Sequence, residues 1–244
     1  PRRWISRNAD GAIMAMVQIL TKSFLGSFRV GWAPGGPIMR FPETSDGHLS
    51  GLLNGLVEAQ RRDKKQRYIR FYCLLPHEAT AAYSFRQACL RPVFPLSSGF
   101  SICLDLHQTM EQLLRGMTSK HRYYVKKSLG ERLRWAVGNT PKLAADFSIL
   151  YAEMVREKKL DALGGHTEDY SRLCTVLGGH AMFLTGYVED EPVTSCLVLT
   201  WGPAAFYLRA ATSRRGRERS AAYAMMYQLI EHLQKQGITH FDFG

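Results

Sequence analysis

The sequence lacks the cysteine and histidine patterns that mark common metal and redox sites. It has five cysteines and eight histidines, but no CxxC and no HExxH motif. The cysteines are widely spread, and several lie inside apolar runs: Cys73, Cys89, Cys103, Cys174 and Cys196. Such thiols are typically reduced and buried in a cytosolic protein. We therefore expect neither a metal site nor a disulfide framework.

Long apolar stretches are also missing. The longest runs have about the length of a strand, whereas a membrane-spanning helix needs about 20 apolar residues. No signal peptide is visible. The chain opens at Pro1 without a methionine and stops at Gly244 directly after an apolar run, so both ends are expected to be trimmed. We expect a cytoplasmic protein, or one that works at the inner face of the membrane.

Acidic residues are the scarcer charge. The chain has 21 of them against 32 basic residues, which gives a net charge of +11. This excess favours an anionic partner, which could be a nucleic acid, a nucleotide, a phosphorylated substrate or an acidic membrane face. With 244 residues and 45% hydrophobic content, the chain can build one large or two modest domains.

The apolar pattern predicts an α/β (α+β) protein of two lobes, residues 1–95 and 96–244. In the first lobe, two strands precede a leucine-rich helix and an aromatic strand, at 12–23, 28–39, 48–62 and 68–76. In the second lobe, three strands precede a helix and a last strand, at 181–188, 194–201, 204–212, a helix ending near Gly237, and 238–243. The same order thus recurs in shorter form near the start, which suggests two related lobes.

Two helix starts of the second lobe have recognisable local signals. Thr109 and Gln112 have the spacing of a capping box. Thr140 is followed by Pro141, which is typical of an N-cap with proline at the first helical position.

The segment that precedes the final helix is strongly basic. Four arginines fall within six residues there: Arg214, Arg215, Arg217 and Arg219. We expect Ser220 to cap the helix, whose first N–H groups and dipole would attract a phosphate. Arginine contacts phosphate oxygens in pairs, and Gly216 would let the backbone approach closely. The alternative is a solvated loop whose arginines only confer solubility.

A second basic cluster lies in "SKHRYYVKKSLGERLR", where tyrosines are interleaved with cations. Cations beside aromatic rings suit an RNA backbone and its unstacked bases. The candidate residues for tRNA or phosphate binding are Lys120, Arg122, Tyr123, Lys126 and Lys127. The alternative is an amphipathic surface helix whose tyrosines pack inward.

The strand, basic turn and helix resemble the acyl-carrier pyrophosphate site of GNAT acyltransferases, although "RRGRER" has Glu218 and Arg219 where a second small residue is expected. More specifically, the chain resembles the FemABX family of tandem GNAT-like enzymes. The similar pieces run in order as "VGWAPGGPIM", "IRFYCLLP", "LDL", "MTSKHRYYVKKSL", "FYLRAATS" and "GITHFDFG". Trp32 and Gly35 stand where that family favours tyrosine and arginine.

The resemblance implies two GNAT-like lobes, each a mixed, mostly antiparallel sheet flanked by helices. It also implies an aminoacyltransferase that moves an amino acid directly from aminoacyl-tRNA to an amine of a peptidoglycan precursor or a similar acceptor. Aminoacyl-tRNA would be the co-substrate without a further cofactor, a phosphorylated or lipid-linked cell-wall precursor the acceptor, and the protein a monomer. Two alternatives stay open, an acyl-CoA-dependent GNAT N-acyltransferase of polysaccharide or cell-envelope biosynthesis and a non-catalytic RNA-binding module.

The resemblance also extends the set of substrate-binding candidates. The "WAPGGP" stretch with Trp32, Gly35 and Gly36 reads as a rigid turn that ends a strand and, by resemblance, as a wall of the acceptor site. Tyr207 and Arg209 alternate along a strand, so we expect them to point to the same face, next to the arginine segment.

An aminoacyl ester is already activated, so its transfer needs mainly positioning, an unprotonated amine and stabilisation of the carbonyl oxygen. The carboxylates that could accept the amine proton are Asp105, Glu78 and Asp242. The leaving 3′-oxygen could accept the proton instead. For Asp242, a role in orienting the amine and a role in capping a turn are both open.

Overall fold

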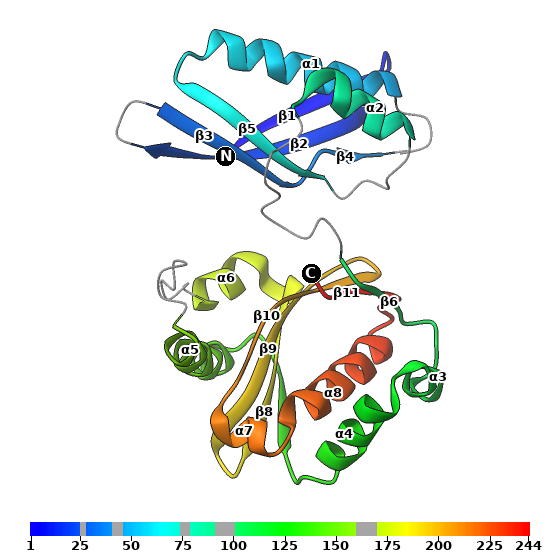
Figure 1. Cartoon of the computed structure of the whole chain (residues 1–244), viewed down its shortest axis with the longest axis vertical. Coiled ribbons are helices and arrows are strands. Elements are labelled where there is room, and N and C mark those ends of the chain that lie inside the picture. Colours follow the sequence, from blue (N-terminus) through cyan, green and yellow to red (C-terminus); the bar gives the residue numbers. More distant parts are fainter. Residues whose placement is uncertain (25–27, 41–45, 74–78, 91–100, 160–169) are drawn as a thin grey trace. The chain divides into compact units, whose positions relative to one another are not determined.

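The computed structural model describes residues 1–24, 28–40, 46–73, 79–90, 101–159 and 170–244 (Figure 1). The chain forms two compact units, Pro1–Gly99 and Phe100–Gly244. None of the described helices is long and apolar enough to cross a membrane.

The N-terminal unit is a sheet with helices on one face. The strands are β1 (Arg2–Arg7), β2 (Ile13–Phe24), β3 (Phe28–Gly35), β4 (Ile38–Met39) and β5 (Gln66–Cys73). Their order is β1-β2-β3-β5, with β4 paired to β2, and only β3 and β5 run parallel. Figure 1 shows α1 (Asp46–Arg62) and α2 (Ala79–Ala88) on the same side of this sheet.

Alternation along β2 explains which face the helices cover. Ala15, Val17 and Ile19 are buried and pack with Leu52 and Leu56 of α1. Successive side chains of a strand point to opposite faces, so these three positions direct one apolar row toward the helix. The residues between them point to the other face of the sheet.

The C-terminal unit is a six-stranded sheet between two layers of helices. Its strands have the order β6 (Cys103–Asp105), β11 (His240–Asp242), β10 (Ala204–Thr212), β9 (Glu191–Trp201), β8 (Ala181–Val188) and β7 (Arg134–Gly138). Only β10 and β11 are parallel. The helices are α3 (Met110–Gly116), α4 (Ser119–Leu129), α5 (Pro141–Glu157), α6 (Tyr170–Leu177), α7 (Arg214–Glu218) and α8 (Ala221–Lys235).

Each face of this sheet has its own apolar core. On one face, Leu229 and Leu233 of α8 pack with Val198 and Phe241. On the other face, Phe147 of α5 packs with residues of α6, β8 and β9, namely Tyr170, Phe183 and Leu197. The two units, with their mixed and mostly antiparallel sheets and flanking helices, confirm the predicted fold class.

A buried polar contact joins α5 to the sheet. The Tyr187 hydroxyl donates to Asp146 Oδ2 over 2.6 Å, and Lys142 Nζ donates to the same oxygen over 2.7 Å. Burial, with the hydrogen bond to Asp146, raises the pKa of Tyr187 above its ordinary value. The phenol therefore stays a donor, and it supplies a hydrogen bond that the nearly buried carboxylate would otherwise lack.

We expect Tyr187→Phe to lower the free energy of unfolding by about 1–3 kcal/mol, because Asp146 loses a buried donor. Urea denaturation followed by circular dichroism measures this change. The matched control is Tyr123→Phe, since Tyr123 is 62% exposed. Equal unfolding midpoints for the two variants would contradict the structural role of the contact.

Candidate functional site

The parallel strands β10 and β11 pair over a short length. Ala204, Ala205 and Phe206 pair with His240, Phe241 and Asp242, and β10 then continues to Thr212. At the end of β11 the Gly244 N–H turns back to donate to Asp242 Oδ1, with φ of +87° at Gly244. In the N-terminal unit, by contrast, β3 stays paired to β5 from Arg29 to Gly35. The two parallel strand pairs therefore differ in the length over which the strands stay paired.

A β-bulge lies in β10 directly after the parallel pairing stops. Tyr207 pairs with Val198 and Arg209 with Leu197, so Leu208 is an extra residue in β10. Because a bulge changes the direction of the following side chains, Tyr207 and Arg209 do not share a face. The prediction that they point the same way is wrong.

The contacts of Tyr207 and Arg209 confirm that they lie on opposite faces. Tyr207 packs in the core beneath α8, with its ring centroid 6.1 Å from that of Phe241. Arg209 Nη1 donates to the Tyr151 hydroxyl of α5 over 2.7 Å. Burial raises the pKa of Tyr207, so its phenol remains a neutral hydrogen-bond donor.

The arginine segment is a short helix, α7, with its own cap. Ser213 Oγ accepts a hydrogen bond from Gly216 N over 3.2 Å, and Ser213 N donates to the carbonyl oxygen of Val193 in β9. Ser220 has φ of +55° and makes no capping hydrogen bond with its side chain. Ser220 thus occupies the predicted N-cap position of α8, but the expected capping by its side chain is not made; the serine that caps with its side chain is Ser213, and it starts the separate helix α7.

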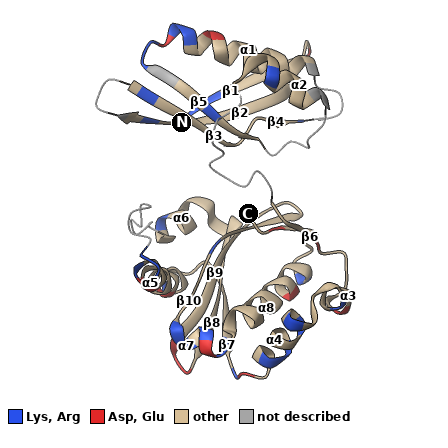
Figure 2. Ribbon diagram, in the orientation of Figure 1, with Lys and Arg blue, Asp and Glu red and all other residues tan. Residues whose placement is uncertain are grey.

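The chain itself supplies negative charge to every arginine of this segment. The ion pairs are Arg214 with Glu218, Arg215 with Glu189 and Glu191, Arg217 with Glu157, and Arg219 with Glu131. For Arg217 and Arg219 the nitrogen to oxygen distance is 2.6 Å. Figure 2 shows blue and red segments together around α7. Four guanidinium groups thus contact five carboxylates, and the crowding of positive charge is balanced without an external anion.

Gly216 has a packing role at this position. Its N–H is already bonded to Ser213, and a Cβ there would lie 2.2 Å from the Val193 carbonyl oxygen. Glycine is therefore required because α7 lies directly on β9. The close backbone approach at Gly216 is made to a strand of the same chain, whereas the sequence suggested an approach to a phosphate.

The basic helix α4 presents all five predicted residues to solvent: Lys120, Arg122, Tyr123, Lys126 and Lys127. Among the described residues, no carboxylate pairs with any of its three lysines. Arg122 has a structural contact, since its Nη1 donates to the carbonyl oxygens of Arg115 and Met117 at the end of α3. Figure 2 shows α4 as a blue stretch.

The two tyrosines of α4 have different environments. Tyr124 stacks on Tyr223 of α8, with ring centroids 5.1 Å apart and an interplanar angle of 19°. Tyr123 meets Tyr124 edge to face and is 62% exposed. The inward-packing interpretation therefore holds for Tyr124, while Tyr123 offers a ring to a partner beside unpaired lysines.

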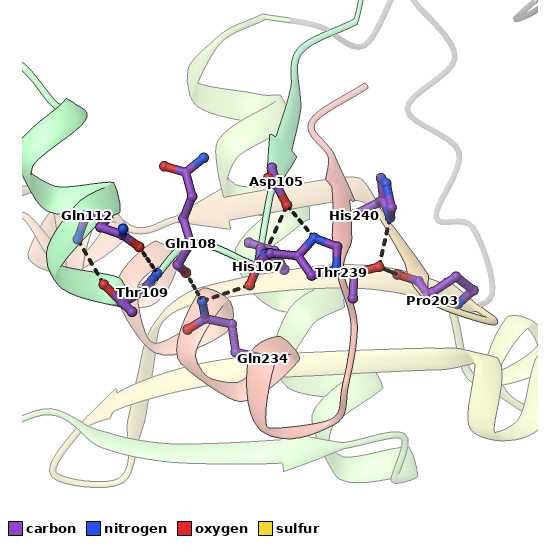
Figure 3. Close-up of polar contacts among 10 residues, drawn as sticks. Asp105, His107, Gln108, Thr109, Gln112, Pro203, Gln234, Thr239 and His240 are labelled. Atoms are coloured by element: carbon purple, nitrogen blue, oxygen red, sulfur yellow. Dashed lines mark hydrogen bonds and ion pairs between the residues drawn. The ribbon is translucent and has the colours of Figure 1, made fainter.

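Asp105 lies in a polar cluster at the edge of the sheet. Its Oδ1 accepts from His107 N over 3.0 Å and lies 2.8 Å from His107 Nδ1, and the rings of His107 and His240 meet edge to face at 6.1 Å (Figure 3). These hydrogen bonds lower the pKa of Asp105. His240 is paired with Ala204, three residues before Tyr207, so the cluster lies about 10 Å along the strand from the bulge.

The other two candidate carboxylates have different outcomes. Asp242 Oδ1 accepts from Gly244 N over 2.8 Å and from Ser101 Oγ, which favours the turn-capping role. Glu78 lies outside the described residues. Within the described ranges, no group of three or more His, Cys, Asp or Glu side chains could hold a metal ion.

The "WAPGGP" residues belong to the N-terminal unit. β3 continues through Gly35, and the predicted turn follows at the cis Gly36–Pro37 peptide. A Cβ on Gly36 would lie 3.0 Å from Val17 Cγ2. Trp32 is 51% exposed on the sheet face opposite α1.

The model of the Acetyltransferase (GNAT) domain family matches residues 115–244. Among solved structures, FemX has a TM-score of 0.72 at 14% identity, covering 100% of this chain and 78% of that chain. L-PGS from Bacillus licheniformis has a TM-score of 0.55 at 12% identity, with 99% and 68% covered. A tandem GNAT protein from the clavulanic acid biosynthesis pathway also has 0.55, at 13% identity, with 98% and 72% covered. No curated protein sequence matches this chain.

Because the Val193 carbonyl leaves no room for a methyl group, we expect Gly216→Ala to lower the free energy of unfolding by about 1–3 kcal/mol. Chemical denaturation measures this change in the free energy of unfolding. The control is Gly55→Ala in α1, where a Cβ meets no atom within 4 Å and alanine should raise stability by up to about 1 kcal/mol. A stabilised Gly216→Ala variant would show that α7 does not rest on β9.

Proposed function

The chain belongs to the GNAT acetyltransferase family and is an acyltransferase, and from this premise we propose that its donor is an aminoacyl-tRNA and its acceptor an amine of a peptidoglycan precursor or a similar cell-envelope molecule. The observation that carries the proposal is the distribution of charge. The arginines of α7 are ion-paired within the chain, whereas the lysines of α4 are exposed without a carboxylate partner among the described residues.

The α7 segment is poorly suited to hold the pyrophosphate of CoA. The N–H groups of Gly216, Arg217 and Ser220 all donate to atoms of the same segment, and Arg217 Nη1 donates to the Thr212 carbonyl oxygen. A pyrophosphate would have to displace these bonds and the ion pairs as well. This occupancy favours a donor held elsewhere over the acyl-CoA alternative.

The surface of α4 suits a polyanion that carries bases. Lys120, Lys126 and Lys127 can contact several phosphates, and the exposed ring of Tyr123 can stack an unpaired base. Tyr124 and Tyr223 hold α4 against α8, which follows the bulged strand β10 in the chain. A donor RNA bound on α4 would therefore be fixed to the same rigid unit as Tyr207.

In the proposed reaction the acceptor nitrogen attacks the ester carbon of the aminoacyl group. A C–N bond forms, the C–O bond to the 3′-oxygen breaks, and the amine proton passes to that oxygen. Tyr207 would donate a hydrogen bond to the carbonyl oxygen as negative charge develops there. The scheme needs no nucleophilic side chain, because the ester is already activated.

The donor assignment is tested by transfer of labelled amino acids from charged total tRNA to peptidoglycan precursors and simple amines. We expect transfer that stops when the donor mixture is treated with RNase, and no transfer from acetyl-CoA. Transfer that survives RNase would overturn the aminoacyl-tRNA donor, and binding of tRNA without turnover would support the RNA-binding module.

Replacing Lys120, Lys126 and Lys127 together by alanine should weaken tRNA binding and lower the slope of log affinity against log salt by about 2–3, because three phosphate contacts are lost. Filter binding across a salt series measures the slope. The charge-matched control replaces Arg61, Lys64 and Lys65, which are exposed in the N-terminal unit. Equal slopes for the two triple variants would remove α4 from the binding surface.

Tyr207→Phe should lower kcat about 100-fold in the same transfer assay, because the carbonyl oxygen loses its proposed donor. The melting temperature should change little, since the ring and its packing are kept. Tyr227→Phe, in the middle of α8, is the control. A kcat equal to that of the parent protein would exclude Tyr207 from the reaction.

A further inference from the structure

One face of the sheet in the N-terminal unit has no helix from the described part of that unit. Both α1 and α2 lie on the opposite side (Figure 1). We call this side the outer face and define it by the outward positions of the strands: Arg3, Ile5, Arg7, Met16, Gln18, Leu20, Lys22, Val30, Trp32, Pro34, Ile38, Tyr68, Arg70 and Tyr72. Its apolar members form two rows, Ile5 with Met16 and Ile38, and Leu20 with Trp32, and the hydrogen-bonded pair of Arg3 and Gln18 lies between the rows.

Large apolar side chains of the outer face are exposed. The exposed fraction is 43% for Ile5, 38% for Leu20, 51% for Trp32, 53% for Ile38 and 53% for Tyr68. Single exposed apolar residues are common on protein surfaces, but several of them on one sheet face mark an interaction site.

The charge of the outer face has one sign. The described strands β1 to β5 contain no Asp or Glu. Arg3 and Arg7 are exposed, and Arg3 Nε donates to the neutral Gln18 Oε1 while Arg7 Nη1 donates to the Gly11 carbonyl oxygen. Neither arginine forms an ion pair with a carboxylate of the described residues. The nearest acidic residue in sequence, Asp10, lies in the turn after β1 and accepts from Asn8 Nδ2.

We propose that the outer face is a membrane-docking surface that binds anionic phospholipid. Aliphatic side chains and a tryptophan favour the boundary between headgroups and acyl chains, and arginines favour negatively charged headgroups. The role goes beyond the proposed transfer reaction, because it concerns where the protein sits and does not depend on which donor or acceptor it uses.

Two other occupants fit the chemistry less well. A single-stranded RNA needs several aromatic rings for its bases, whereas three of the five large apolar side chains exposed on the outer face are aliphatic, namely Ile5, Leu20 and Ile38 beside the rings of Trp32 and Tyr68. A second copy of the chain in a two-fold dimer would set Arg3 and Arg7 against the same cationic patch without a carboxylate.

The test is flotation of the full chain with vesicles of phosphatidylcholine, alone or with about 30% phosphatidylglycerol. We expect binding to the anionic vesicles and little binding to the neutral ones. Replacing Arg3 and Arg7 by glutamine should lower the partition coefficient about 10- to 30-fold, since each basic residue near a membrane contributes a factor of about five. The control replaces Arg61 and Lys64 by glutamine, which changes the net charge equally at the end of α1 and in the turn that follows it.

Contact of the outer face itself is read from tryptophan quenching by brominated lipid. The fraction of tryptophan fluorescence that the brominated lipid quenches should fall in Trp32→Phe. It should be retained in Trp201→Phe, although Trp201 is 74% exposed. The proposal is overturned if the parent protein does not bind anionic vesicles, or if the two charge variants bind these vesicles equally well. It is also overturned if the Arg3 and Arg7 variant loses tRNA binding but keeps vesicle binding. None of these results depends on transfer activity, so failure of docking and failure of the transferase are distinguished.

Discussion

The C-terminal unit depends on the contact between α7 and β9. Gly216 lies against the Val193 carbonyl, and Ser213 both caps α7 and donates to that same carbonyl oxygen. Ion pairs from this helix then reach the β8–β9 turn, α5 and the segment after α4. Because these partners are partly exposed, each pair contributes little alone, but together they fix the connection between β10 and α8. The position of α8, and of the helix α4 that packs on it, follows from this contact.

The arginines of the α7 segment form ion pairs with glutamates of the same chain, so an anionic partner is more readily bound by other basic residues. Two surfaces combine exposed basic residues with exposed apolar or aromatic side chains, namely α4 and the outer face of the N-terminal sheet. The two surfaces differ in what accompanies the charge. On α4 the companions are tyrosines, which suit bases, whereas on the outer face they are isoleucine and leucine together with Trp32 and Tyr68, a combination that suits the lipid interface. A polyanion and a membrane can therefore be assigned to separate units of one basic protein.

Local signals in the sequence predicted local structure well. The Thr109 capping box and the Thr140–Pro141 helix start are both confirmed, and so are the strands that surround α8. The candidate site was harder to predict, because the contacts that form it join residues far apart in the sequence. Arg217 and Arg219 meet glutamates 60 and 88 residues away, and no spacing rule predicts such pairs. The cap at Ser213 does have a local signal, because serine is a favoured N-cap residue and its side chain accepts from the N–H three residues later, here that of Gly216.

The bulge at Leu208 shows how one residue alters a functional prediction. With regular alternation, Tyr207 and Arg209 would share a face and could act on one ligand. With the extra residue, Tyr207 joins the core beneath α8 and Arg209 joins α5. A bulge leaves no signature in "FYLRAAT", because its apolar and small residues suit either register. It becomes visible only when β9 is placed beside β10, since the mismatch exists between two strands and not within one. The pairing with the neighbouring strand therefore determines which side chains of a strand point toward a substrate.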